Sequence, residues 1–273
     1  MTTPSPRVLD LFAVPDDAAS LPGGSGDSVH AGDLVLSPGR DPEIAAWLHP
    51  LLARLAVRLD ERPRRRSRDL RIAVPVPARD GSWVVDGWGA SRYEPGTVVC
   101  RDLDVLTAAG RVLHAELAVA VPERPPGLDK RDDRWAEAER LAFGPPEYVA
   151  TAADRRGEPG LRSLAADVVA GLGDATGPDQ LVHGDLAGNV LLDRAGAPVV
   201  IDVSPYWRPV LWAEAVCVLD AVLWLGAEPS VMTDWSDAAR RDAMCRAALF
   251  RVLSDRPCDV AAYRRALQPA LPN

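Results

Sequence analysis

Lysine is almost missing from this sequence, and acidic residues outnumber basic ones. The 273 residues include 31 Lys and Arg against 39 Asp and Glu, which gives a net charge of −8. This balance argues against nucleic-acid binding as the main function, because such proteins carry a basic excess on their binding surface. Lys130 is the only lysine, so a phosphate bound elsewhere in the chain would be met by arginine.

Cysteine and long apolar runs are also scarce. The 4 cysteines form no Cys-x-x-Cys pair and no cluster with histidine, which argues against a zinc site. No apolar run approaches the length of a membrane span, since the longest, residues 210–227, is interrupted by Glu214 and Asp220. The first residues lack the basic start and apolar core of a signal peptide. We therefore expect a cytoplasmic protein with reduced thiols and no membrane partner.

The N-terminal part of the chain has the pattern of a glycine-rich hairpin. A leader segment at residues 1–20 precedes Gly23, Gly24 and Gly26, which are typical of a turn. Apolar residues then alternate loosely over residues 29–36, which predicts a strand.

A helix and further strands complete this part. Asp41 and Pro42 are suited to the N-cap and first turn of a helix whose apolar residues recur at helical spacing. Strands are expected at residues 70–78 and 82–93. Residues 21–96 are thus predicted to form a small β-rich lobe with one helix.

The remainder, residues 97–273, is predicted to be mainly helical. One β-hairpin, formed by NVLLD and PVVIDV, interrupts the helices. Helical periodicity is found in five further segments: residues 103–121, 161–172, 210–226, 236–253 and 259–268.

The hairpin belongs to the most informative stretch, residues 181–209, which reads LVHGDLAGNVLLDRAGAPVVIDVSPYWRP. Asp185 lies on a loop just before a strand, Asn189 begins that strand, and Asp202 ends the next one. Because the turn folds the strands back on each other, the Asn189 and Asp202 ends are expected side by side, with Asp185 on the adjoining loop. Oxygen ligands grouped in this way suit Mg²⁺. Phosphoryl transfer uses such a metal together with a carboxylate that orients the attacking hydroxyl.

This stretch resembles the catalytic core of the aminoglycoside phosphotransferases, a branch of the protein-kinase-like superfamily. That branch has a His-Gly-Asp catalytic loop with a downstream Asn, and then an Asp in the position of the kinase Asp-Phe-Gly aspartate. The resemblance implies that Asp185 is the catalytic base, that Asn189 and Asp202 hold the metal, and that His183 packs the loop. The SPYWRP sequence at residues 204–209 further resembles an actinobacterial group placed in this superfamily.

The resemblance also implies a fold and an activity. The order of elements fits an α+β, bilobal protein-kinase-like fold, with a small β-rich N-terminal lobe and a larger, mainly helical C-terminal lobe. The implied activity is ATP-dependent phosphotransfer to a hydroxyl of a small molecule, with ATP and Mg²⁺ as cofactors. The glycine turn would cover the ATP phosphates with backbone N–H groups. Arg40 or Arg208 would supply the charge that the family takes from lysine.

Two departures from the family pattern leave another function open. Asn189 follows Asp185 by four positions, where the family's loop has five, and a displacement of about 1 Å can cost on the order of a hundredfold in rate. Ser37 occupies the position in which the family places its phosphate-binding lysine, and Arg40 differs from lysine in reach and shape. The alternative is a pseudokinase-type binding module that transfers no phosphoryl group.

Each site residue also has an ordinary structural interpretation. Asp185 would be a turn or helix-cap residue, and Asn189 would form a turn with Gly188. The glycine-rich segment would be only a tight hairpin turn. Arg208 would pair with an acidic neighbour such as Asp185.

Several aromatic side chains and one histidine are predicted to lie in the interior. Trp83 and Trp88 are expected in the core of the β-rich lobe, in preference to a role in adenine binding. His114, Trp212 and Trp224 lie on apolar helical faces and are expected to be buried.

Overall fold

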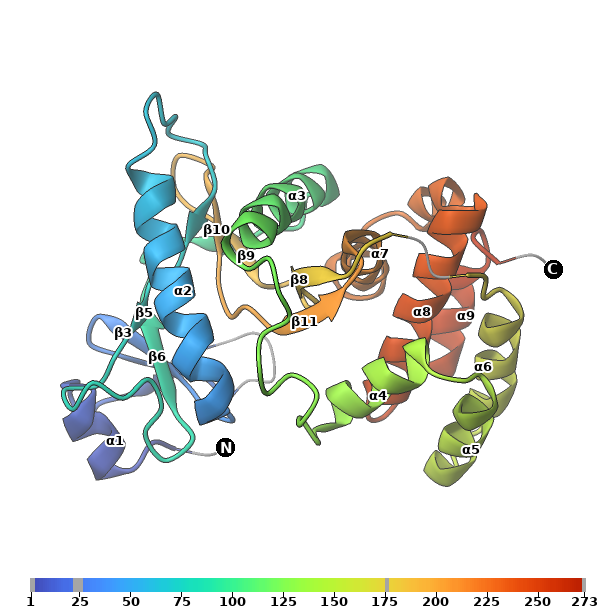
Figure 1. The fold of residues 1–273 in the computed structure, drawn as a ribbon, viewed down its shortest axis with the longest axis horizontal. Helices are drawn as coiled ribbons and strands as arrows, with labels where there is room; N and C mark the ends of the chain where they lie inside the picture. Colours follow the sequence, from blue (N-terminus) through green and yellow to red (C-terminus); the bar gives the residue numbers. More distant parts are fainter. Residues whose placement is uncertain (1–2, 22–26, 175–176, 272–273) are drawn as a thin grey trace. The chain divides into compact units, whose positions relative to one another are not determined.

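The chain, described by a computed structural model over residues 3–21, 27–174 and 177–271, divides into two units (Figure 1). Gly23, Gly24 and Gly26 lie outside the described residues. Unit 1 is made of three segments, residues 1–100, 119–129 and 188–203. Unit 2 is made of residues 101–118, 130–187 and 204–273.

The described residues of unit 1 form two sheets. Their strands are β1 (Ala19–Ser20), β2 (Val29–Ala31), β3 (Leu34–Ser37), β4 (Arg71–Ile72), β5 (Pro75–Val76), β6 (Gly89–Arg92), β7 (Val98–Val99), β9 (Val190–Leu192) and β10 (Pro198–Val200). The five-stranded sheet has the order β1-β2-β3-β6-β5 and is antiparallel throughout. The four-stranded sheet has the order β4-β10-β9-β7, in which only the β4–β10 pair is parallel.

The single strand predicted at residues 29–36 is divided into two antiparallel strands, β2 and β3, by a turn at Gly32 and Asp33. Side chains alternate between the core and half-buried positions along both strands, as the pleat of a strand requires. The core beneath them is formed by nine buried residues: Val8, Phe12, Val29, Leu34, Leu36, Ala78, Val85, Trp88 and Ala90. Trp88 is therefore a core residue, as predicted, whereas Trp83, predicted to lie in the same core, is only half-buried.

The strands predicted at residues 70–78 and 82–93 are shorter and interrupted. Residues 71–72 pair with β10, whereas residues 75–76 pair with β6, so the chain passes from one sheet to the other between them. Of the second prediction only β6 is a regular strand, because Asp86 and Gly87 adopt left-handed φ values of 48° and 80° and turn the chain.

Helices α1 (Pro6–Leu11) and α2 (Pro42–Asp60) belong to unit 1. Asp41 caps α2 by accepting from the backbone N–H groups of Glu43 at 2.7 Å and Ile44 at 3.1 Å, and Pro42 occupies the first turn. Both predictions for this helix start are confirmed. Its buried face packs on β4 and β5.

Unit 2 is mainly helical. It contains all but the last two residues of α3 (Leu103–Ala120), then α4 (Arg134–Phe143), α5 (Glu147–Arg156), α6 (Leu161–Ala170), α7 (Val210–Asp220), α8 (Ala238–Ser254) and α9 (Val260–Leu267). A π-helical turn, η1 (Ala221–Leu225), extends α7, and a 3₁₀ segment, η2 (Pro229–Trp235), follows. The only regular strand pair of the described part of unit 2 joins β8 (Gln180–His183) to β11 (Pro205–Arg208).

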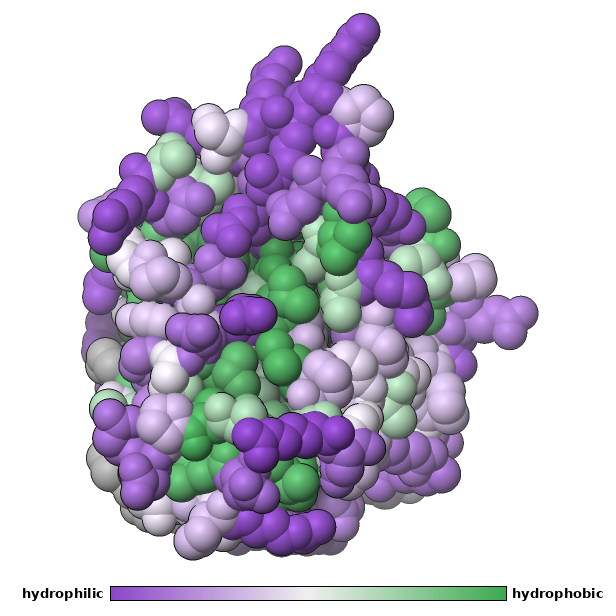
Figure 2. Space-filling model, turned by 90° about the vertical axis from the view of Figure 1, so that its left-hand side faces the viewer, coloured by the Kyte–Doolittle hydropathy of each residue, from purple (hydrophilic) through white to green (hydrophobic). Residues whose placement is uncertain are grey.

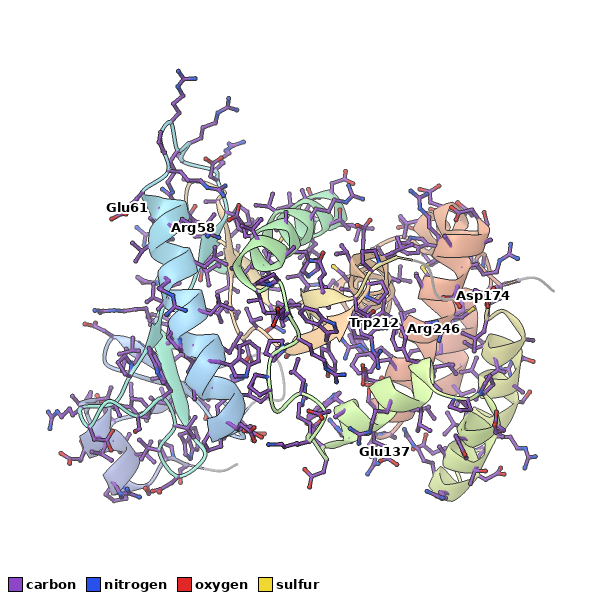
Figure 3. All side chains as sticks on the ribbon, viewed as in Figure 1. Arg58, Glu61, Glu137, Asp174, Trp212 and Arg246 are labelled. Carbon is purple, nitrogen blue, oxygen red and sulfur yellow. The ribbon has the colours of Figure 1, made fainter. Side chains whose placement is uncertain are left out.

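The core of unit 2 is centred on Trp212 and on α8, which packs against α4, α6 and α7 (Figures 1 and 3). The Trp212 ring lies edge-on to Tyr206 and Phe250, with ring centroids 5.4 Å apart in each case. Its predicted burial is confirmed. The burial predicted for Trp224 is wrong, since this side chain is 50% exposed. It lies on the π-helical turn, where the wider helix changes the face that each side chain occupies.

The surface has two further features. Figure 2 shows hydrophilic side chains over much of one face, with apolar side chains gathered between them. In unit 1, a hollow of about 360 Å³ is lined by residues of the segment after α1 and of β3, β5 and β6. None of the predicted site residues that the structure describes lines it. No helix in the described residues is long and apolar enough to cross a membrane.

Candidate active site

The His-Gly-Asp loop of unit 2 is held by hydrogen bonds to a histidine ring. The backbone N–H groups of Asp185 and Ser204 donate to Nδ1 of His183 at 3.2 and 3.3 Å. Because Nδ1 accepts, the neutral ring carries its hydrogen on Nε2. The N–H of His183 in turn donates to Nε2 of His114 at 3.1 Å.

Both histidines are buried, which confirms the interior position predicted for His114. Burial, together with the adjacent His183, lowers the pKa of His114 to about 3. A neutral His114 has the lone pair that the backbone N–H of His183 requires. His183 therefore packs the loop and also orients it.

Position 184 has room only for glycine, because its backbone lies against the rings of Tyr206 and Trp212. A Cβ atom at this position would lie 2.4 Å from Cδ2 of Tyr206 and 3.1 Å from the Trp212 ring. The close approach follows from the β8–β11 pairing, in which His183 faces Pro205 and the Gly184 N–H donates to the Ser204 carbonyl at 3.0 Å. The SPYWRP segment thus forms the strand that supports the loop, a role that the sequence did not reveal.

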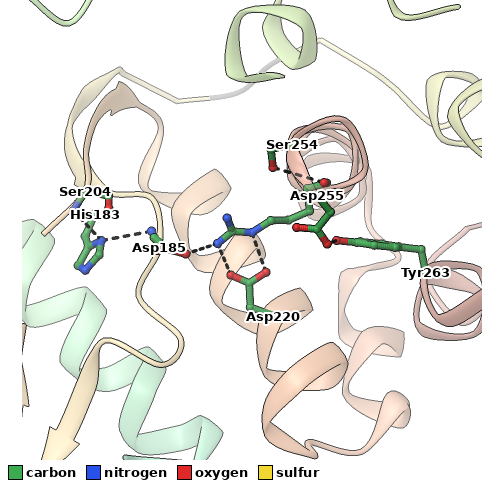
Figure 4. A network of polar contacts seen from close by, with 8 residues as sticks. His183, Asp185, Ser204, Asp220, Ser254, Asp255 and Tyr263 are labelled. Carbon is green, nitrogen blue, oxygen red and sulfur yellow. Dashed lines mark hydrogen bonds and ion pairs between the residues drawn. The ribbon is translucent and has the colours of Figure 1, made fainter. Parts of the chain in front are cut away.

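The Asp185 carboxylate is paired with a guanidinium from α8. Its Oδ1 lies 2.5 Å from Nη2 of Arg251, and the Asp185 side chain is 41% exposed (Figure 4). Arg251 also donates through Nε to Oδ1 of Asp220 at 2.8 Å and through Nη2 to Oδ2 of the same carboxylate. Sequence reasoning missed Arg251 and Asp220, because the contacts of Arg251 with Asp185 and with Asp220 join segments far apart in the chain.

In unit 1, β9 and β10 form the predicted hairpin. Val190 faces Val200, and the Ile201 N–H donates to the Asn189 carbonyl at 2.9 Å. The Asn189 and Asp202 ends of the two strands therefore lie side by side, as expected. Gly188 and Asp202 have left-handed φ values of 86° and 47°, which glycine adopts easily and aspartate tolerates better than most residues.

Arg40 is the cation that contacts Asp202. Its Nη2 lies 2.6 Å from Oδ1 of Asp202, and its backbone N–H donates to the Gly87 carbonyl at 2.9 Å. A Cβ at Gly89 would lie 3.1 Å from Cγ of Arg40 and 3.2 Å from Cε1 of His49, so glycine leaves room for both side chains. Burial, reinforced by the Arg40 charge, lowers the pKa of His49 to about 4.

Ser37, at the position predicted for the family's lysine, contacts another serine. Its hydroxyl lies 3.0 Å from the hydroxyl of Ser28. That Arg40, three residues on, supplies the charge that the family takes from lysine stays a prediction.

The Arg208 side chain contacts other residues of unit 2. Its guanidinium pairs through Nε with Glu139, lies 4.0 Å from Asp179, and stacks on Phe143 with 4.1 Å between Cζ and the ring centroid. Its acidic partner is thus Glu139, whereas that of Asp185 is Arg251. A role for Arg208 in nucleotide binding stays a prediction.

The residue types at the end of the hairpin fit a magnesium ion. An amide and a carboxylate are hard oxygen donors, and Mg²⁺ takes waters and phosphate oxygens as its other ligands. In the described residues no group of three or more His, Cys, Asp or Glu side chains is arranged to hold a metal ion. Asp185 belongs to unit 2, whereas Asn189 and Asp202 belong to unit 1, so the convergence of the three side chains stays a prediction.

Comparison with known proteins gives matches at the level of structure. No family model and no curated protein matches the chain. A thermostable mutant of the aminoglycoside phosphotransferase APH(4)-Ia, solved with ADP and hygromycin B, has a TM-score of 0.57 and 16% identity, over 97% of this chain and 96% of that chain. The chain has the protein-kinase-like fold of the aminoglycoside phosphotransferases.

Two other kinds of phosphotransferase share this fold. The choline kinase LicA from Streptococcus pneumoniae has a TM-score of 0.53 and 13% identity, over 97% of this chain and 96% of that chain. The AMP-bound spectinomycin phosphotransferase APH(9)-Ia has a TM-score of 0.50 and 12% identity, over 90% of this chain and 84% of that chain. The predicted α+β protein-kinase-like fold is confirmed.

Proposed function

We propose that this protein is an ATP-dependent phosphotransferase that acts on a hydroxyl group of a small molecule. The observation that carries the proposal is the Asp185 carboxylate. It is partly exposed on a loop whose backbone is fixed by His183, in a fold shared with proteins named as phosphotransferases. A carboxylate held in this way is suited to orient a hydroxyl for in-line attack on a phosphoryl group.

The other residues have roles on the nucleotide side. Asn189 and Asp202 would hold Mg²⁺, which when bound neutralises phosphate charge. Arg40 would contribute the cation that the family takes from lysine, since it already reaches Asp202 at 2.6 Å. Asp185 would accept the proton of the acceptor hydroxyl. We further propose a cytoplasmic enzyme that uses ATP and does not act on nucleic acid.

A pseudokinase-type binding module is a second candidate, and the Arg40–Asp202 ion pair favours it. A guanidinium 2.6 Å from Oδ1 neutralises the carboxylate that would otherwise attract a metal ion. Metal binding then has to compete with this contact, and a nucleotide would bind without Mg²⁺ or not at all.

Thermal unfolding with ATP, ADP and Mg²⁺, added singly and together, separates the two candidates. For a phosphotransferase we expect Mg·ATP to stabilise the protein by about 2.7 kcal/mol at a hundred times its Kd, and Asp202→Asn to remove the Mg²⁺-dependent part. Release of ADP together with a phosphorylated acceptor, detected by mass spectrometry, would establish transfer.

Asp86→Asn is a closely matched control. Asp86 also has a left-handed φ, 48°, and pairs with an arginine at 2.6 Å, and its side-chain exposure of 43% is close to the 41% of Asp202. This variant should keep the full Mg·ATP effect. Stabilisation by ATP alone that is equal in wild type and Asp202→Asn would favour the binding module, as would no effect of millimolar nucleotide on the wild type.

A further inference from the structure

Arg251 contacts two carboxylates whose environments are opposite. Asp220, on α7, is fully buried, and Arg251, on α8, has a side chain only 4% exposed. Asp185 is 41% exposed at the loop surface. A single guanidinium therefore connects the interior of unit 2 to the predicted catalytic carboxylate (Figure 4).

The Asp220 contact explains how Arg251 is fixed. A buried guanidinium without a partner would be strongly destabilising, and Asp220 satisfies it through two of its nitrogens. Burial opposes the charge of Arg251, but the two aspartates raise its pKa well above the usual value. Burial raises the pKa of Asp220, and the guanidinium against it limits that rise.

Aromatic rings also restrict the plane of the guanidinium. The Cζ atom of Arg251 lies 4.8 Å from the ring centroid of Phe250 and 5.5 Å from that of Trp224. Contacts at these distances are cation–π interactions. The donor presented to Asp185 thus has a direction set by the helical core.

We propose that Arg251 is the positioning residue of the predicted catalytic base, an inference that rests on the proposed function. Nη2 binds Oδ1 of Asp185 and thereby fixes the rotation of the carboxylate. Oδ2 is then the oxygen directed to the acceptor hydroxyl. Asp220 anchors Arg251 and thereby holds the guanidinium against Asp185.

Lysine would not replace arginine here. The guanidinium donates to Asp220 through both Nε, at 2.8 Å, and Nη2. The same Nη2 also donates to Asp185, at 2.5 Å. An ammonium group is a single point charge on a flexible stem and cannot reproduce this planar arrangement. Arg251→Lys therefore keeps the charge but loses the orientation.

The test must separate positioning from stability, because Arg251→Met alone leaves Asp220 buried and unpaired. The double variant Arg251→Met with Asp220→Leu replaces the buried pair by apolar residues of similar volume, an exchange that proteins often tolerate. Arg246→Met is the control on the same helix. It removes a guanidinium paired with Asp242 at 2.9 Å, and its other hydrogen bonds to described residues are to the carbonyls of Ala142 and Gly173.

Steady-state rates with Mg·ATP are measured as ADP release, with water as the acceptor until a hydroxyl acceptor is found. We expect kcat of the folded double variant to fall roughly ten- to a hundredfold, by analogy with small displacements of reacting groups, while KM for ATP changes less than about twofold. Arg251→Lys should lie between the double variant and the wild type. Arg246→Met should leave kcat unchanged, whatever it does to the melting temperature.

Two results would overturn the inference in distinguishable ways. A folded double variant with the kcat of an active wild type would exclude a positioning role and leave the proposed function intact. Absence of ADP release from the wild type, equal to that from Asp185→Asn, would contradict the proposed function and the positioning role with it.

Discussion

In this chain with a single lysine, each of the predicted site residues Asp185 and Asp202 forms an ion pair with an arginine. Arg40 lies 2.6 Å from Asp202, and Arg251 lies 2.5 Å from Asp185. A guanidinium remains charged at any physiological pH and donates hydrogen bonds in fixed directions, whereas an ammonium is a mobile point charge. Each carboxylate is therefore held in an orientation as well as neutralised.

His114 makes the stability of the protein sensitive to acid. Its pKa in the folded chain, about 3, lies below the ordinary 6.5, so the unfolded chain binds more protons between these values. Stability is then complete above about pH 6.5 and is lost as the pH falls, by at most about 1.4 kcal/mol per pH unit for one histidine.

His114→Gln should flatten this dependence, because glutamine retains an acceptor for the His183 N–H but does not titrate. The free energy of unfolding, measured in urea between pH 7 and about pH 5, is expected to fall less steeply than in wild type. Parallel curves for the two proteins would contradict the assignment. His49, whose pKa burial lowers to about 4, should contribute a second part of the slope.

At the scale of elements, the β8–β11 pair joins the His-Gly-Asp motif at residues 183–185 to the SPYWRP motif at residues 204–209. The register places His183 opposite Pro205 and brings the ring of Tyr206 onto Gly184. The glycine of the His-Gly-Asp motif is thus explained by sterics within unit 2, independently of any ligand.

Gly184→Ala should destabilise the protein by about 1–3 kcal/mol or more, the usual cost of overpacking a core. The new methyl group would have to displace the Tyr206 ring, which is itself packed against Trp212 and Phe250. Gly173→Ala is the control, since a Cβ there would meet only Cβ of Asp242 at 3.9 Å. Denaturant unfolding of both variants tests this, and equal stabilities would contradict it.

Sequence patterns predicted the elements whose signals are local. The start of α2 at Asp41 and Pro42 and the β9–β10 hairpin are examples, because a cap and a tight turn depend on neighbouring residues. β11 was not predicted, since its strand character comes from pairing with β8. Trp224 was wrongly assigned to the core, because a π-helical turn leaves no periodic signal in the sequence.

The candidate site was also predicted only in part. Asp185, Asn189 and Asp202 were found through a motif, whereas Arg251 and Asp220 carry none. Their contacts span 66 and 31 residues of sequence, and only the packing of α7 and α8 brings them together.

At the scale of the whole chain, the segments of the two units alternate along the sequence. The β4 and β7 strands of unit 1 take their partners from residues 188–203, far along the sequence. The N–H groups of Ala73 and Cys100 donate to Val200 and Val190, each at 2.9 Å. Some backbone groups of the first hundred residues therefore find their hydrogen-bond partners only in residues 188–203.

A fragment of residues 1–100 should show this loss in hydrogen exchange. The amides of Ala73 and Cys100 are expected to exchange rapidly in the fragment and slowly in the full chain. Leu36 and Ala90, paired within the five-stranded sheet, serve as the internal reference. Protection of Ala73 and Cys100 in the fragment equal to that in the full chain would contradict the pairing.

The backbone contact between Gly184 and Ser204 has a consequence for exchanging parts between proteins of this fold. The N–H of Gly184 and the carbonyl of Ser204 are 3.0 Å apart, so the segment between them leaves and re-enters unit 2 at neighbouring points. Segments with adjacent ends tolerate replacement well. The hairpin that carries Asn189 and Asp202 is thus suited to replacement. A chimera with the corresponding hairpin of another protein would keep the core around Trp212 unchanged.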